Sequence, residues 1–419
     1  MRRRPGIVVL VFGIFFVISL LTNIQGPLLP DIIGTFQLSL GLAGFLPFAF
    51  FVAYGVMSIP AGLMIQRFDE KPVLLAAFVG AFLGAALFVT RPTYPVMLFS
   101  LFTIGLAMAM LQVAINPLLR VAGGEENYAF FGVMAQFFFG AASWASPYLY
   151  QYLVRQLGPQ ATEGGNAVIA LLQRVVDPGR AWISMYWVFT AVTLAMVIVI
   201  ALARIPRVEL AESERAGTMR SHAGLLRSRL VLMFFLGTFS YVGLEQGVSI
   251  WISKFLQDYH QVDPQAAGAI ANSWFWGLQT LGCLLGLVLL RLFDARRVLV
   301  AFGLLAAGTL AAALTGPRAV SMVAFPVVGF WTSVMWSIIF SLALNSVDRH
   351  HGAFAGILCS GIAGGAVVPL VVGRLGDAVG LRAAMLVIFV PIAYIVSIGI
   401  WARPLVQNAT IRRRKEAAA

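Results

Sequence analysis

The sequence predicts an all-α membrane protein with about twelve transmembrane helices, and three observations support this prediction. Apolar residues make up 60% of the 419 residues and charged residues only 11%, against roughly 45–50% and 25% in soluble domains. Apolar runs of about 20 residues, the length that a helix needs to cross a bilayer, recur along the whole chain. Short segments that contain Arg and Lys separate these runs. A soluble fold could not bury so much apolar surface, so this class is excluded.

Twelve apolar runs are long enough to span a membrane, and they form two sets of six. The first set lies near residues 7–29, 40–64, 72–91, 94–117, 128–153 and 182–203. The second set lies near residues 231–253, 265–290, 296–315, 319–344, 353–373 and 382–402. A polar stretch of mixed charge separates the sets and is typical of a cytoplasmic linker. The predicted domains are therefore residues 1–203, the linker 204–229, and residues 230–419 with a basic tail.

The distribution of Lys and Arg predicts the orientation in the membrane. If the N-terminus is cytoplasmic, the segments on that side contain 21 of the 29 Lys and Arg residues by count, and the opposite segments contain 8. Cytoplasmic loops of membrane proteins carry such an excess. We therefore expect an inner-membrane protein with both termini in the cytoplasm. The net charge of +12 is spread over many loops, so nucleic-acid binding is not expected.

A short repeat relates the two sets of spans. Residues 68–71 (FDEK) follow the second span, and residues 293–296 (FDAR) follow the eighth, 225 residues later by subtraction. A motif that recurs at the same loop of each set indicates parallel repeats related by an axis along the membrane normal. The sequence thus predicts two pseudo-symmetric six-helix bundles that rock about a central site. Prolines 27, 30, 117 and 369 lie within or near span ends, where they can loosen helices that bend.

The loop after the second span carries a known signature. Residues 62–71 (GLMIQRFDEK) resemble the G-x-L-x-D-R-x-G-R motif of the major facilitator superfamily, with Gln66 in place of its acid and Glu70 in place of its second glycine. The resemblance implies that charges here pair across the ends of the halves and bias one conformation. Ordinary positive-inside anchoring is the alternative. The predicted gating residues are Arg67, Asp69, Lys71, Asp294 and Arg296.

Further stretches resemble the fucose and glucose/galactose permease branch of that superfamily. They are residues 28–30 (LLP), 36–39 (FQLS), 111–117 (LQVAINP), 135–136 (AQ), 241–251 (YVGLEQGVSIW), 275–277 (FWG), 338–344 (IIFSLAL) and 361–369 (GIAGGAVVP). Their shared order covers both halves. The resemblance implies the major facilitator fold, alternating access and a sugar substrate, with a proton or sodium ion as coupling partner.

The chain also departs from this branch at polar positions. Gly26 stands where the fucose permease has an acid, and Gln112 stands where it has a glutamate. Phe139 replaces an asparagine, and Cys283 replaces an arginine. The acids that the family uses for proton coupling are therefore missing from the N-terminal half.

Polar side chains nevertheless converge on several predicted spans. Helical spacing puts Gln112 beside Asn116, Gln136 beside Ser143, Tyr241 beside Glu245 and Ser249, and Asn272 beside Gln279. Polar groups at membrane depth need partners or water, so these faces predict a wet central cavity whose amides and hydroxyls bind a polyol. Hydrogen bonding between helices is the alternative for each of them. The predicted substrate-binding residues are Asn23, Gln25, Gln112, Asn116, Gln136, Tyr241, Glu245, Gln246, Asn272, Trp276 and Gln279.

Two tryptophans of the eighth span cannot share a helical face, because Trp274 and Trp276 are two residues apart. One of them can stack on a ligand while the other meets lipid or packs inside. Asp31 and Asp348 lie at span ends or in loops, where we expect them to be solvated.

Glu245 is the acid that the sequence places deep within a span. An acid at the centre of a membrane helix costs roughly 2.5–3.5 kcal/mol on insertion scales, so a compensating role or partner is expected. Glu245 can alternately bind a proton or sodium ion, which makes it the candidate coupling residue, or it can accept hydrogen bonds from substrate hydroxyls. A third possibility is a glutamate paired with Gln279 that only fixes helix packing.

The functional hypothesis is a secondary active transporter of a sugar or related polyol. An exporter of amphipathic or drug-like compounds is the alternative, favoured by the 32 phenylalanines. A membrane scaffold without transport has no positive support. Phosphate loops, paired catalytic carboxylates and metal-ligand spacings are lacking, so neither an enzyme nor a metal or cofactor is expected. We expect a monomer in the lipid bilayer with a small-molecule substrate.

Overall fold

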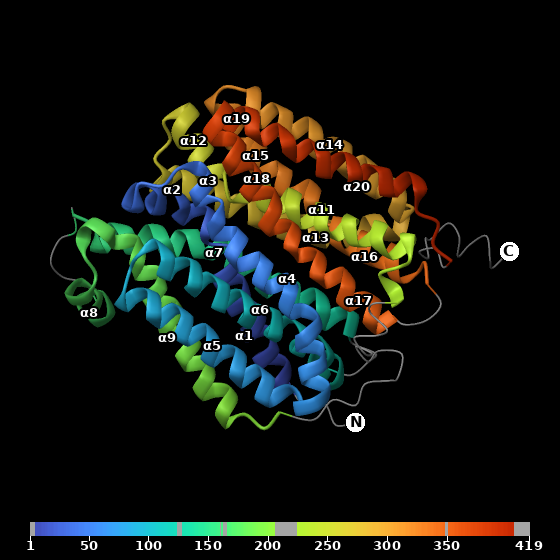
Figure 1. Cartoon of the computed structure of the whole chain (residues 1–419), viewed down its shortest axis with the longest axis horizontal. Helices are drawn as coiled ribbons and strands as arrows, with labels where there is room; N and C mark the ends of the chain where they lie inside the picture. Colours follow the sequence, from blue (N-terminus) through green and yellow to red (C-terminus); the bar gives the residue numbers. More distant parts are fainter. Residues whose placement is uncertain are drawn as a thin grey trace.

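The computed structural model describes residues 5–123, 128–159, 161, 166–205, 224–347 and 351–405, and these residues form a bundle of long helices without a strand (Figure 1). Eleven helices in this part of the chain are long and apolar enough to cross a membrane. The predicted fifth span is also helical but is not among those eleven. We count it as the twelfth pass because it packs against the first and eighth spans. The predicted all-α membrane fold is confirmed.

The N-terminal half occupies the lower left of Figure 1, coloured blue to green. Its elements are α1 (Pro5–Thr22), α2 (Gln25–Phe36), α3 (Leu40–Ala43), α4 (Phe45–Phe68), α5 (Glu70–Thr90), α6 (Tyr94–Gly123), α7 (Tyr128–Leu157), α8 (Ala167–Val175), the short helix η2 (Pro178–Ile183) and α9 (Ser184–Leu202).

The C-terminal half occupies the upper right, coloured yellow to red. Its elements are α11 (Arg229–Ser249), α12 (Ile252–His260), η4 (Pro264–Gly268), α13 (Ala269–Leu292), α14 (Ala295–Thr315), α15 (Arg318–Thr332), α16 (Met335–Leu344), α17 (His351–Ser360), η5 (Gly361–Ala363), α18 (Gly364–Val379), α19 (Leu381–Ala384), η6 (Met385–Ile388) and α20 (Phe389–Trp401). Residues 206–223 of the predicted linker and the basic tail from residue 406 lie outside the described residues. The domain boundaries at 203 and 230 stay a prediction.

Both ends of the described chain lie at the same end of the bundle, as an even number of passes requires (Figure 1). We call this end the terminal face. The opposite end carries the short helices α2, α3, α12 and α19, and we call it the distal face. The halves meet along two seams, one between α7 and α13 and the other between α4 and the α17–α18 segment.

The first span of each half is interrupted. In the N-terminal half the break falls at Asn23 and Ile24, between α1 and α2. Pro27 explains this break, because it has no N–H to bond the carbonyl of Asn23 and its ring crowds that carbonyl. In the C-terminal half the break falls at Ile250 and Trp251, between α11 and α12. Matching interruptions in two repeats are a feature of transporter binding sites.

A second pair of matching features lies at two helix crossings. Gly105 of α6 packs on the backbone carbonyl of Phe50 in α4, and Gly329 of α15 packs on that of Phe275 in α13. A Cβ atom at either glycine would collide with the carbonyl oxygen. Phe275 follows Phe50 by 225 residues, the same offset as the loop repeat, and Gly329 follows Gly105 by 224. The two halves therefore use the same close contact between their second and fourth spans.

Candidate functional site

A carboxylate, a phenol and an amide meet between α11 and α13, as the sequence predicts for these three residues. Tyr241 and Glu245 lie one turn apart on α11, and the Tyr241 hydroxyl donates to Glu245 Oε1 at 2.6 Å. Gln279 Nε2 of α13 donates to the same carboxylate oxygen and to the Tyr241 hydroxyl oxygen, the latter at 3.0 Å. Gln246 Nε2 donates to Glu245 Oε2 at 3.4 Å. The pairing of Glu245 with Gln279 is therefore present.

These hydrogen bonds leave the charge of Glu245 without a countercharge among its bonded partners. All three partners are neutral donors. Neutral donors stabilise an ionised carboxylate but do not neutralise it, and at membrane depth an unneutralised charge is costly. A proton or a small cation would remove that cost, and a substrate hydroxyl would add a further donor. The geometry thus supports both functional roles that the sequence left open.

Asn272 extends this network toward the distal face. Its Nδ2 donates to the backbone carbonyl of Ser249, where α11 ends, and the Ser249 hydroxyl donates to Gln246 Oε1 at 3.4 Å. Gly26 of α2 packs on this contact, since a Cβ atom there would lie 2.8 Å from Asn272 Nδ2. The fucose permease has an acid at the position of Gly26. In this protein the same position forms a close contact between the halves.

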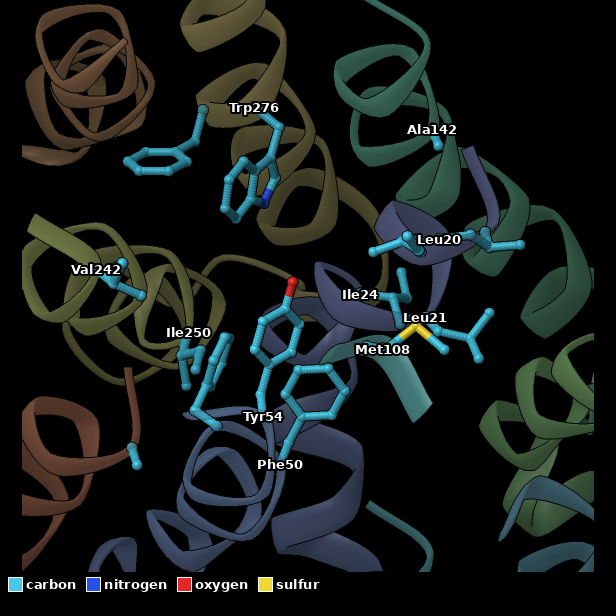
Figure 2. Close-up of a cluster of buried hydrophobic side chains, with 14 of the residues drawn as sticks. Leu20, Leu21, Ile24, Phe50, Tyr54, Met108, Ala142, Val242, Ile250 and Trp276 are labelled. Atoms are coloured by element: carbon cyan, nitrogen blue, oxygen red, sulfur yellow. The ribbon is translucent and has the colours of Figure 1, made fainter. Parts of the chain in front are cut away.

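A plug of apolar and aromatic side chains fills the contact between the halves beside this network. Figure 2 shows Trp276 of α13 and Tyr54 of α4 on opposite sides of it, with Ile24, Val242 and Ile250 nearby. Trp276 and Tyr54 are buried, with 4% and 6% of their surface exposed. The Trp276 indole N–H has no partner among the described residues.

The structure resolves the two-tryptophan alternative. Trp276 points inside, as Figure 2 shows, whereas Trp274 is 41% exposed and packs edge-on against Trp144, with ring centroids 6.1 Å apart.

The two predicted site residues of the first span, Asn23 and Gln25, have different surroundings. Asn23 Nδ2 donates to the Ser143 hydroxyl of α7 at 2.7 Å, and the Ser143 and Ser19 hydroxyls lie 2.5 Å apart. Gln25 is 8% exposed, and neither atom of its amide has a partner among the described residues. It lines a narrow apolar recess with Leu28, Leu29, Ile32, Leu46, Pro47, Met97, Leu101, Tyr186 and Ile250. A role of Asn23 and Gln25 in substrate binding stays a prediction.

The structure does not join the predicted amides of α6 and α7 to the Glu245 network by any contact that it describes. Gln112 is half-buried on α6, and Gln136 is exposed on α7. The side chain of Asn116 lies outside the described part of the chain. Their place on the substrate pathway is untested.

The predicted gating cations hold the last helix of their own half. Lys71 Nζ donates to the carbonyls of Ala201 and Ala203 at the end of α9, both at 2.8 Å. Arg296 Nη1 donates to the carbonyl of Ala402 at the end of α20 at 3.0 Å, and its Nε lies 3.5 Å from Asp294 Oδ1. Cations near helix C-termini are stabilised by the exposed carbonyls and the helix dipole. Arg67 is exposed. A gating role across the halves stays a prediction.

Two acids that the sequence did not assign to a site join the halves at the distal face. Asp31 of α2 accepts a hydrogen bond from Gln265 Nε2 of η4 at 2.9 Å and another from the Tyr150 hydroxyl. Asp377 of α18 accepts from the backbone N–H groups of Leu40 and Gly41, at 2.8 and 2.9 Å. These hydrogen bonds of Asp31 and Asp377 hold the halves together at the distal face, and we call them the distal latches. The expectation that Asp31 is simply solvated is therefore wrong. A position at the end of a span does not reveal which residues of the other half lie against it.

A twelve-pass bundle of two matching halves, with a carboxylate network beside their contact and latches at one face, defines a membrane transporter of the alternating-access class. The chain belongs to the Major Facilitator Superfamily, whose family model matches residues 11–368. The resemblance seen in the sequence is thereby confirmed.

Curated relatives refine this assignment. The chain is 28% identical over 396 residues to a glucose/galactose transporter of Brucella abortus biovar 1 (strain 9-941), with 92% of each chain covered. It is 26% identical over 395 residues to the L-fucose-proton symporter of Escherichia coli (strain K12), with 88% of this chain and 87% of the relative covered.

Solved structures share the fold. The transporter FucP in its outward conformation matches with a TM-score of 0.68 at 21% identity, covering 94% of this chain and 98% of that chain. A bacterial homologue of the human lysosomal transporter Spinster, inward-facing and occupied, matches with a TM-score of 0.76 at 14% identity, covering 95% and 96%.

Proposed function

We propose that this protein is a secondary active transporter of a sugar or related polyol and that Glu245 carries the coupling ion. The observation that carries the proposal is the network of Tyr241, Glu245 and Gln279 at membrane depth beside the contact between the halves. The names of the relatives, a glucose/galactose transporter and an L-fucose-proton symporter, support the choice of substrate class and of a proton as the ion.

The chemistry of the network suits a ligand rich in hydroxyl groups. Gln279 Oε1, Asn272 Oδ1 and Trp276 Nε1 are buried and have no partner among the described residues. A buried polar atom without a partner costs about 1–3 kcal/mol. Hydroxyl groups both donate and accept, so one polyol can satisfy the two amide oxygens and the indole N–H together.

The proposed setting follows from the charge distribution. The excess of Lys and Arg on one side supports an inner-membrane protein with cytoplasmic termini, so the terminal face is inside and the distal face outside. We infer a monomer, surrounded by lipid, in which the distal latches are closed while the substrate exchanges with the cytoplasm.

Uptake by purified protein in proteoliposomes tests the proposal. Radiolabelled D-glucose, D-galactose and L-fucose are offered under an imposed pH gradient, with an imposed sodium gradient in a parallel series. We expect saturable accumulation of at least one sugar, and only with the pH gradient. Absence of saturable uptake of all three would refute the sugar assignment, and accumulation with the sodium gradient alone would refute the proton.

The plug between the halves keeps the exporter hypothesis as a second candidate. Its side chains include Leu20, Phe50 and Met108, which give it the apolar character of a drug-binding site (Figure 2). Cells that express the protein would then extrude a lipophilic cation such as ethidium faster than control cells. Saturable sugar uptake without ethidium extrusion excludes this alternative.

A further inference from the structure

Tyr54 lies among the apolar and aromatic side chains between the halves, where its ring packs against Phe50. It belongs to α4, in the second span of the N-terminal half, and is 94% buried by its 6% exposure. Figure 2 shows its hydroxyl pointing away from α4, toward Trp276 of the other half. The hydrogen bond that the structure describes for Tyr54 is accepted by its backbone carbonyl, from the Ser58 hydroxyl, and none is described for the phenol hydroxyl.

Three other tyrosine hydroxyls, two of them buried and one part-buried, have described partners. Tyr241 donates to Glu245, Tyr150 to Asp31, and Tyr394 to the carbonyl of Met233 at 2.9 Å. Buried tyrosine hydroxyls usually find such partners, because an unpaired one loses its bonds to water without replacement. The Tyr54 hydroxyl is therefore available to bond a group that the described part of the chain does not supply.

The position of Trp276 indicates where that partner lies. Its indole N–H is buried and has no partner among the described residues, and it belongs to the opposite half. Trp276 is three residues before Gln279, so it lies on the same side of α13 as the Glu245 network. Two unpaired polar groups thus face each other from the two halves, next to the proposed binding network.

We propose that Tyr54 is a substrate-positioning residue whose hydroxyl binds one hydroxyl group of the transported sugar. The inference rests on the proposed sugar transport and adds to it a contact from the N-terminal half. One sugar hydroxyl can accept from the Trp276 indole N–H while it donates to the Tyr54 oxygen. A ligand held in this way links both halves.

This link has a consequence for transport. A ligand shifts a conformational equilibrium only by its difference in affinity between the states. A sugar that contacts Tyr54 and Trp276 together binds best when the halves are close around it and less well when they part. It therefore favours the closed intermediate that a transporter passes through between its two open states.

The test is Tyr54→Phe in proteoliposomes, with the sugar that the wild type transports and with its monodeoxy analogues. The substitution removes one hydroxyl and keeps the ring. We expect KM for the intact sugar to rise roughly three- to ten-fold, as for the loss of one hydrogen bond. The analogue that lacks the contacted hydroxyl should show the same KM for both proteins, whereas the other analogues should keep the difference.

Tyr394→Phe is the matched control, because its hydroxyl is satisfied inside the C-terminal half, and its KM should equal that of the wild type. Equilibrium binding of the radiolabelled sugar gives a Kd for Tyr54→Phe even if this variant transports too slowly for kinetics. An unchanged KM and Kd, or an equal penalty for the intact sugar and for every analogue, would overturn the role of Tyr54. Failure of the wild type to move any of the three sugars would instead refute the proposed function, and this inference with it.

Discussion

The two halves of this transporter share a frame but differ in chemistry. Gly105 and Gly329 pack on backbone carbonyls at matching crossings. At the terminal face, Lys71 and Arg296 bind the last carbonyls of the sixth span in their respective halves. The C-terminal half alone adds a described carboxylate network at membrane depth, around Glu245. The packing contacts within the halves are therefore duplicated, whereas the Glu245 network belongs to the C-terminal half and the bonded carboxylate described in the N-terminal half, Asp31, lies at the distal face.

The corresponding polar cluster of the N-terminal half is neutral. Asn23 of α1 bonds to Ser143 of α7, next to Ser19. Neutral amides and hydroxyls bond substrate or neighbouring helices, but they cannot exchange a proton near neutral pH. If transport is coupled to protons as proposed, this difference places the coupling in the C-terminal half, and the following predictions test that expectation and the matching contacts of the halves.

The largest effect is expected for Glu245→Gln. The amide keeps the size of the side chain but can neither be ionised nor take up a proton. Accumulation of sugar against its gradient should be abolished, whereas exchange of internal for external sugar should persist, because exchange needs no net ion movement. Gradient-driven uptake and equilibrium exchange in the same proteoliposomes measure the two activities.

Asp258→Asn is the control for this change, since Asp258 is paired with Lys254 in α12, away from the network. It should leave both activities intact. Loss of exchange together with accumulation in Glu245→Gln would assign Glu245 to substrate binding. Unchanged accumulation would show that coupling does not depend on the C-terminal carboxylate.

Because the two helix crossings match, Gly105→Ala and Gly329→Ala should lower the stability of the protein equally. In each variant the added methyl group meets a phenylalanine carbonyl, and overpacking of this kind costs about 1–3 kcal/mol. Both variants should lower the apparent melting temperature of the detergent-solubilised protein by a similar amount. Gly80→Ala is the control, because nothing lies within 4 Å of its added Cβ atom, so it should be neutral or stabilising. Damage in one half only would disprove the equivalence of the two crossings.

A smaller effect is expected at the distal face for Asp377→Ala. The variant removes the acceptor of two backbone N–H groups of the other half, so the closed distal face loses one of its latches. A cysteine at position 39 should then react several-fold faster with a water-soluble maleimide, because hydrogen bonds to charged groups contribute about 1.5–3 kcal/mol. Asp177→Ala removes a carboxylate that caps a turn within the N-terminal half and should not change the rate. An unchanged rate in Asp377→Ala would show that this contact does not hold the face closed.

Hydropathy and helical spacing were sufficient to predict the spans and the hydrogen-bonded cluster of Tyr241, Glu245 and Gln279. Tyr241 and Glu245 are four residues apart, so they had to share a helical face, and Gln279 was the amide on the next span that could reach them. Pro27 was expected to loosen the first span, which breaks four residues earlier.

Contacts between the halves could not be predicted in this way. Asp377 and Tyr54 acquire their surroundings from residues more than 200 positions away, and the spacing within one helix says nothing about the partner across the seam. The inward position of Trp276 is different, because spacing within α13 does indicate it: Trp276 lies four residues after Asn272 and three before Gln279, on the helical face that the network uses.

The smallest effect is expected for the two cations at the terminal face. Lys71→Met and Arg296→Met each remove a charge from a helix C-terminus, where such a charge contributes about 0.3–1 kcal/mol. Each variant should lower the apparent melting temperature by a few degrees at most, to a similar extent in the two halves, and should keep most of the transport rate. A thiol-reactive dye that reports exposure of Cys283 and Cys359 on unfolding measures the stability, and Arg67→Met, at an exposed cation of the same loop, is the control. If Lys71→Met instead reduced transport at least ten-fold with unchanged stability, the loop would act as the gate that its resemblance to the superfamily motif implies. Lys71 and Arg296 would then have different roles, and the two halves would not be equivalent at the terminal face.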